Sequence, residues 1–118
     1  MKENVIQDKS YKFAIKIIEL FRKLSKGDGV LAKQLLRSGT SIGANVEEAI
    51  GAQTRQDFFS KMTIAYKEAR ETRYWIRLLI DGNLLGSEKG SELRNDCEEL
   101  LRIIGSIQKT IREGNREG

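Results

Sequence analysis

The chain has 118 residues, a formal net charge of +4, and a composition that is 39% hydrophobic and 32% charged. This length holds one domain with a real core, and the mixture excludes a disordered chain. Charged residues interrupt every apolar stretch, so we expect neither a membrane segment nor a signal peptide. The one cysteine, Cys97, cannot form an internal disulfide, which indicates a cytoplasmic protein.

Glycine-containing breaks divide the chain into four segments, and no proline interrupts any of them. Apolar residues recur in steps of three and four, which predicts helices at about residues 8–26, 29–51, 55–81 and 88–112. Left-handed glycines are expected after three helices, at Gly27, Gly51 and Gly82. Capping side chains are expected at Asp28, Thr54 and Ser87, and frayed ends at residues 1–7 and 113–118. Similar helices joined by short turns predict one all-α domain over residues 1–118, an antiparallel up-down-up-down bundle.

The first helix carries more apolar surface than one bundle can bury. Its apolar residues are Tyr11, Phe13, Ala14, Ile15, Ile17, Ile18, Leu20, Phe21 and Leu24. They cover more than half of its circumference, whereas a helix in a monomeric bundle needs about a third. Since large exposed apolar patches usually mark interfaces, we expect Tyr11, Ile15 and Ile18 to join copies of the chain. The alternative is a central helix that touches three others.

The second helix contains Gly39 and Gly43 one turn apart, within a run of small side chains. A glycine inside a helix costs about 1 kcal/mol relative to alanine, so these positions predict close packing of another helix. A phosphate-binding loop is excluded, because the spacing and the Lys-Ser/Thr ending are wrong and no strand precedes the run.

The third helix has a similar apolar surplus. Its core stripe is predicted at Phe58, Met62, Ala65, Ala69, Thr72, Ile76 and Leu79. Ile64, Trp75 and Leu78 lie away from that stripe and complete the predicted oligomer interface. Closed cyclic symmetry is the simplest way for identical chains to cover such faces, so we expect a ring.

The fourth helix offers little chemistry. Its single apolar stripe runs through Leu93, Cys97, Leu100, Ile104, Ile107 and Ile111, so Cys97 is interpreted as a small core residue. The chain has no histidine, so a nucleophile lacks a ready base and a di-metal site lacks its Glu-x-x-His ligands. We therefore expect no catalytic residue, metal or cofactor. Four glutamates of the second and third helices suggest a di-metal site: Glu47, Glu48, Glu68 and Glu71. Salt bridges with Arg37, Arg70 or Arg73 explain these glutamates better.

Two groups of cations are candidates for contact with nucleic acid. A narrow arc of the first helix carries Lys9, Lys12, Lys16, Lys23 and Lys26, and one face of the third carries Arg70, Arg73 and Arg77 beside Phe59 and Tyr66. Arginine beside an aromatic ring can hold a phosphate and stack on an unpaired base. The alternatives are a solvated lysine face and arginines that pack against tyrosine between helices. A sequence pI near 9.3 permits RNA contact without requiring it.

Three runs of the sequence are distinctive: residues 9–14 (KSYKFA), 33–49 (KQLLRSGTSIGANVEEA) and 67–75 (KEARETRYW). In this order they resemble the 23S rRNA intervening-sequence proteins, small bacterial proteins often labelled ribosomal. The resemblance spans about residues 8–111, and three separate motifs make it specific. Ala32 stands where the family pattern is expected to have serine, which is a small departure.

The resemblance implies a four-helix bundle that assembles into a pentameric ring. The family takes its name from genes that lie inside insertions of large-subunit rRNA, which suggests contact with RNA. The chain is also similar to the accessory proteins of diversity-generating retroelements, pentameric bundles that bind a reverse transcriptase and nucleic acid. The family brings no catalytic residues, so none are carried over.

These features together predict a non-enzymatic cytoplasmic homopentamer that binds RNA or a ribonucleoprotein through a basic surface, without a membrane or a cofactor. Lys12, Lys16 and Lys23 are the expected phosphate contacts, with Arg73 and Arg77 as stacking or phosphate groups. The alternative is a protein-interaction scaffold with no nucleic-acid role. In that case the apolar surplus and the arginines serve only the ring and a protein partner.

Overall fold

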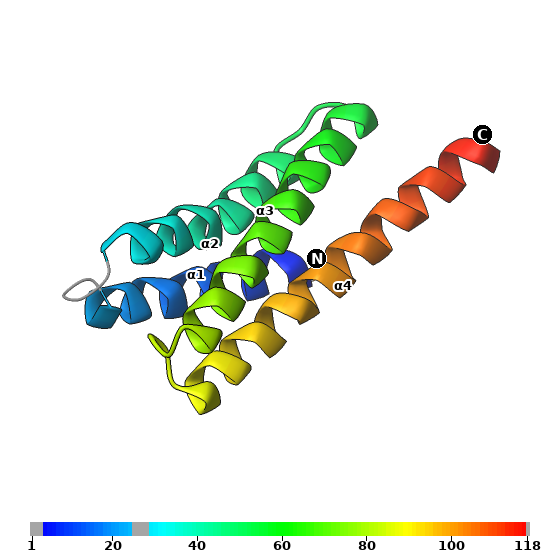
Figure 1. The fold of residues 1–118 in the computed structure, drawn as a ribbon. Coiled ribbons are helices and arrows are strands. Elements are labelled where there is room, and N and C mark those ends of the chain that lie inside the picture. The colour runs from blue at the N-terminus through cyan, green and yellow to red at the C-terminus, as the bar shows by residue number, and fades with distance from the viewer. Residues whose placement is uncertain (1–3, 25–28, 118) are drawn as a thin grey trace.

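The computed structural model describes residues 4–24 and 29–117, which fold into four α-helices (Figure 1). They are α1 (Val5–Leu24), α2 (Gly29–Ile50), α3 (Arg55–Asp81) and α4 (Ser87–Glu117). These residues contain no strand, so the predicted all-α class is confirmed. Within the same ranges, no helix is long and apolar enough to cross a membrane.

Helices that follow one another in the chain are neighbours in space, and α4 also contacts α1. Among the described residues no close backbone contact joins the diagonal pairs, α1 with α3 or α2 with α4. This is the predicted up-down-up-down bundle. Figure 1 shows α4, a helix of 31 residues, continuing past the N-terminal end of α1. In that part α4 lies against α3, where the Gln108 side-chain amide donates to Thr63 Oγ1 at 3.1 Å.

Two predicted helix ends are wrong. α1 begins at Val5 rather than near residue 8, because Asn4 caps it: the Gln7 backbone N–H donates to Asn4 Oδ1 at 3.0 Å. α4 runs to Glu117 rather than 112, so residues 113–117 are helical instead of frayed. No proline stops the helix there, and a lone glycine is tolerated inside it. The predicted end of the first helix at residue 26 lies outside the described residues.

In the turn from α3 to α4, the left-handed conformation occurs at Asn83 and not at the predicted Gly82. Gly82 has φ −83° and ψ 4°, whereas Asn83 has φ 62°. Asparagine adopts positive φ more readily than most residues, because its short side chain can form local hydrogen bonds. No described glycine has a positive φ, so the prediction is wrong for Gly51 too, and Gly27 lies outside the described residues.

Of the predicted helix caps, Thr54 is confirmed. Its hydroxyl oxygen accepts a hydrogen bond from the Asp57 N–H at 3.0 Å. Ser87 is instead the first residue of α4, preceded by Gly86, whose carbonyl accepts from the Gly90 N–H at 2.8 Å. The predicted cap at Asp28 lies outside the described residues.

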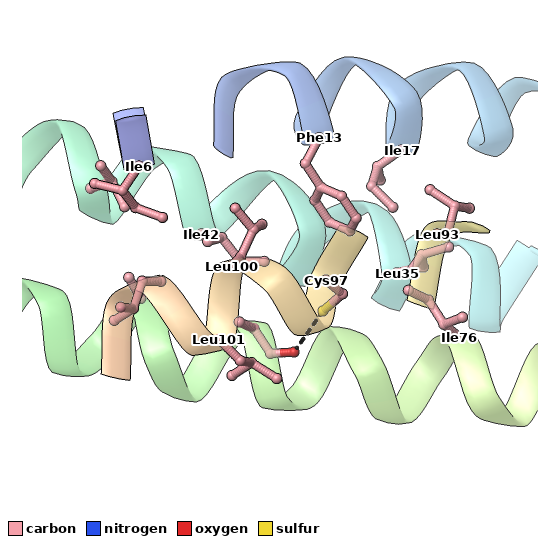
Figure 2. Packing of buried hydrophobic residues seen from close by; sticks show 14 of the residues in the cluster. Ile6, Phe13, Ile17, Leu35, Ile42, Ile76, Leu93, Cys97, Leu100 and Leu101 are labelled. Atoms are coloured by element: carbon pink, nitrogen blue, oxygen red, sulfur yellow. Dashed lines mark hydrogen bonds between the residues drawn. The ribbon is translucent and has the colours of Figure 1, made fainter. Parts of the chain in front are cut away.

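The core lies where the apolar stripes of the four helices meet (Figure 2). Its fully buried side chains include Ile17 from α1, Leu35 and Ile42 from α2, Ile76 and Leu79 from α3, and Leu93 and Leu100 from α4. The predicted stripes of α3 and α4 are buried except at two positions that are half-buried, Phe58 and Ile107. The hydroxyl of Thr72 donates to Ser38 Oγ at 2.9 Å, so this buried polar pair is satisfied inside the core.

Cys97 belongs to this core, as predicted. Its thiol donates to the Ala69 carbonyl oxygen at 3.2 Å, the contact dashed in Figure 2. Burial raises the pKa of Cys97 to about 12, although the nearby charge of Arg73 opposes part of that rise. The thiol therefore stays protonated at neutral pH and is a poor nucleophile.

Gly39 and Gly43 lie where α2 meets α1. A Cβ atom at Gly39 would lie 2.9 Å from Cγ1 and 3.0 Å from Cγ2 of the buried Ile17. A Cβ atom at Gly43 would lie 3.3 Å from the backbone carbonyl oxygen of Ser10. These distances are shorter than ordinary contacts, so the absence of two side chains allows α1 to approach α2 closely.

We expect Gly39→Ala to lower the free energy of unfolding by on the order of 1–2 kcal/mol, because overpacking outweighs the gain of about 1 kcal/mol in helix propensity. The control is Gly105→Ala in α4, where the new Cβ would lie 3.6 Å from the Tyr66 ring, an ordinary contact. That change should stabilise the protein by about 0.5–1 kcal/mol. Urea denaturation at one protein concentration compares the two, and equal stabilities would contradict the close packing.

We expect the folded protein to protect Cys97 from thiol reagents. At pH 8 its reaction with an aromatic disulfide should be slower than in denatured protein by roughly a hundredfold or more, because the raised pKa suppresses the thiolate. Absorbance of the released thiol measures both rates, with glutathione as the control for the reagent. Rapid labelling without denaturant would show that the thiol is not held in the core.

Candidate nucleic-acid and assembly surfaces

The predicted lysine arc of α1 lies against carboxylates of α4. Lys9 Nζ lies 3.3 Å from Glu99 Oε2. Lys16 Nζ lies 2.8 Å from Asp96 Oδ2 and 3.7 Å from Glu92 Oε1. The hydrogen bond to Asp96 raises the pKa of Lys16, which keeps its ammonium group charged. A phosphate group would have to displace a carboxylate at both lysines.

Lys12, a third lysine of the arc, is also less available than the sequence suggests. Lys12 pairs with Asp8 on the same helix at 3.0 Å. Lys23 is exposed, and Lys26 lies outside the described residues. Exposed ion pairs contribute only about 0–1 kcal/mol to stability, but they cancel charge where a phosphate is expected. The arc is therefore a weaker anion site than its row of lysines implies.

The aromatic residues expected beside the α3 arginines are packed between α3 and α4. Phe59 and Tyr66 are both half-buried. The Tyr66 ring lies beside Gly105 of α4, and the guanidinium carbon of Arg112 lies 5.9 Å from the centre of the Phe59 ring. These two rings serve interhelical packing, whereas Arg70 and Arg77, which the alternative placed between the helices, are exposed.

The outer face of α3 carries a row of exposed cations. We define the α3 strip as Lys67, Arg70, Tyr74 and Arg77, exposed residues spaced by three, four and three positions. None of its cations forms an ion pair within the described part of the chain. Arg73 is half-buried and lies outside this strip. Sequence reasoning named Arg70 and Arg77 but missed Lys67 and Tyr74, which the helical spacing alone places on the same side.

The four glutamates considered for a metal site bind neighbouring helices instead. Glu68 and Glu71 of α3 both pair with Arg37 of α2, the first at 3.3 Å. Glu71 also accepts from Trp75 Nε1 at 2.9 Å. Glu48 pairs with Lys61 at 3.0 Å, and Glu47 accepts from the Gln7 amide at 2.9 Å. The predicted salt bridges with Arg37 are confirmed, and no metal-binding group of His, Cys, Asp or Glu occurs in the described ranges.

The apolar residues predicted to form an interface lie at the surface of the single chain. Tyr11 is 65% exposed, and Ile15, Ile18, Ile64 and Leu78 are also exposed. Trp75 is half-buried. On the α1 side, Tyr11 borders a groove of about 210 Å³ between α1 and α2, and this groove is floored by small residues that include Gly43 and Ala44. Two apolar faces, one on α1 and one on α3, are thus open to other molecules.

The model of the 23S rRNA-intervening sequence protein family matches residues 2–106, close to the span of the sequence resemblance. No protein with a curated function matches the chain. Among solved structures, the chain is similar to a protein of unknown function from the S23 ribosomal protein family of Bacteroides thetaiotaomicron. The two are 45% identical with a TM-score of 0.86, over 88% of this chain and 98% of the other. The chain therefore belongs to the 23S rRNA-intervening sequence protein family.

Proposed function

We propose that this protein is a non-enzymatic, cytoplasmic, self-associating binding module that contacts RNA or a ribonucleoprotein. The observation that carries the proposal is the charge of the α3 strip, because Lys67, Arg70 and Arg77 have no carboxylate partner in the described ranges. The name of the family refers to 23S rRNA, which supports RNA as the ligand class.

The strip is a better phosphate site than the lysine arc for a physical reason. A cation that already has a carboxylate partner must lose it when a phosphate binds, so part of the electrostatic gain is cancelled. Lys9 and Lys16 are in that position, whereas Arg70 and Arg77 pair with no carboxylate of the described residues. Arginine also presents a planar fork of donors that matches phosphate geometry. We therefore assign the main phosphate contacts to α3, with the lysine arc in a secondary role.

Self-association would strengthen this surface. The exposed apolar faces of α1 and α3 lie on different helices, so contact between one face and the other in successive copies is heterologous and closes into a ring if the rotation allows. The resemblance to pentameric proteins suggests five copies. Each copy adds its net charge of +4 to one assembly and so raises the positive potential that attracts RNA.

We expect Arg70→Gln/Arg77→Gln to weaken binding to a labelled RNA hairpin with a single-stranded tail by about tenfold or more. Each lost phosphate contact should also reduce the slope of log affinity against log salt by roughly 1. The matched control is Lys9→Gln/Lys12→Gln, which removes the same charge from lysines that already have partners. Fluorescence anisotropy over a salt series measures both. Equal losses in the two variants, flat salt dependence or no binding at low salt would count against the α3 site.

We expect Ile15→Glu to dissociate the assembly, because the change places a charge in the apolar face of α1. Light scattering should then give the 13.4 kDa mass of one chain at micromolar concentration, and the unchanged protein a multiple of it. Val30→Glu is the control, since Val30 is 74% exposed at the start of α2 and is not part of the predicted interface. A single-chain mass for the unchanged protein would rule out the ring.

The exposed apolar faces also favour a second candidate, a scaffold that binds a protein partner. The groove beside Tyr11 and Ala44 is apolar and lies on the surface, as a protein-binding site requires. Affinity purification after nuclease treatment separates the two candidates. Protein partners that persist without RNA favour the scaffold, whereas recovery of RNA that is lost on nuclease treatment favours the first proposal.

A further inference from the structure

The α3 strip has an aromatic ring between its two arginines. Arg70 and Tyr74 are four residues apart, and Tyr74 and Arg77 are three residues apart. Side chains at these spacings are neighbours on a helix surface, about 5–6 Å apart at their Cβ atoms. The two arginines are separated by about 10 Å along the helix axis, at 1.5 Å per residue. An exposed ring therefore lies between two exposed arginine side chains along the outer face of α3.

Contacts on one side hold this ring in place. Tyr74 packs edge-to-face on Trp75, with ring centres 5.1 Å apart and planes at 66°. Trp75 is fixed by its Nε1–H donation to Glu71 at 2.9 Å, and Glu71 pairs in turn with Arg37 of α2. Tyr74 nevertheless remains 51% exposed. A ring that is restrained before binding loses less conformational entropy when a ligand stacks on it.

This arrangement distinguishes unpaired nucleic acid from a duplex. A duplex keeps its bases stacked inside and offers only phosphates and groove edges to a helix surface, so Tyr74 would gain little from it. An unpaired segment can place a base face on the ring while the phosphates on either side reach the arginines. Phe59 and Tyr66 are packed against α4 and do not provide such a platform.

We propose that Tyr74 is a stacking platform for one base of a single-stranded RNA segment, whose phosphates are held by Lys67, Arg70 and Arg77. This inference rests on the proposed function, because it specifies which form of RNA the basic surface recognises. Lys67 precedes Tyr74 by two turns on the same face and extends the path of the strand along α3.

The test compares oligouridine, which has little structure of its own, with an oligoadenosine–oligouridine duplex of the same length. The full chain should prefer the single strand. Tyr74→Leu should weaken single-strand binding by on the order of 5- to 150-fold, the measured range for loss of one base–aromatic stack. Duplex binding should not change. Tyr74→Phe should keep the preference because it keeps the ring, so it is the matched control for the loss of the ring at this position.

Several results would overturn the stacking role. One is that Tyr74→Leu lowers both affinities equally, or lowers neither, which is the outcome for a ring that does not contact bases. A second is a changed mass of the assembly when the same variant is measured by light scattering. That result would place Tyr74 in the contact between copies of the chain instead. If either result occurs while Arg70→Gln/Arg77→Gln still reduces salt-dependent binding, the stacking role fails and the proposed function stands. If the unchanged protein binds neither RNA at low salt, both fail.

Discussion

The close approach of α1 to α2 is the contact on which the surfaces of this protein depend. It requires two positions without side chains, because Ile17 occupies the space beside Gly39 and the Ser10 backbone lies beside Gly43. Once α1 is seated there, its remaining faces are fixed. The lysines on one flank meet the carboxylates of α4, and Tyr11 on the other flank borders the groove over Gly43. The close contact at these two glycines thus determines which lysines of α1 are paired and which of its apolar side chains are exposed.

The contact of α2 with α3 sorts the charges of α3. The run from Lys67 to Arg73 alternates basic and acidic residues, but the helical period places the two signs on different faces. Glu68 and Glu71 turn toward α2, where Arg37 occupies both of them. In the described part of the chain, the cations on the outer face pair with no carboxylate. Residues 67–73 therefore carry little net charge in the sequence, but the outer face that they form is positively charged.

The lysine arc and the α3 strip show how similar sequence features acquire different roles. Both are rows of cations at helical spacing, and neither row by itself reveals its partners. The arc pairs with α4 because α1 and α4 are antiparallel neighbours that bring Lys16 beside Asp96, 80 residues away in the chain. Among residues 4–24 and 29–117, no carboxylate forms an ion pair with the α3 strip. Its cations therefore remain available to an external anion.

The sequence by itself determined the four helices, their buried stripes, the cap at Thr54 and the glycines at the α1–α2 contact. These features follow from the helical period and from local backbone chemistry, which neighbouring residues encode. It did not determine that Asn83 rather than Gly82 takes positive φ, or that α4 continues to Glu117. Nor did it determine which cations are paired or that Tyr74, rather than Tyr66, is open. Only the tertiary structure decided these points, because ion pairing and exposure depend on which distant helix packs against each face.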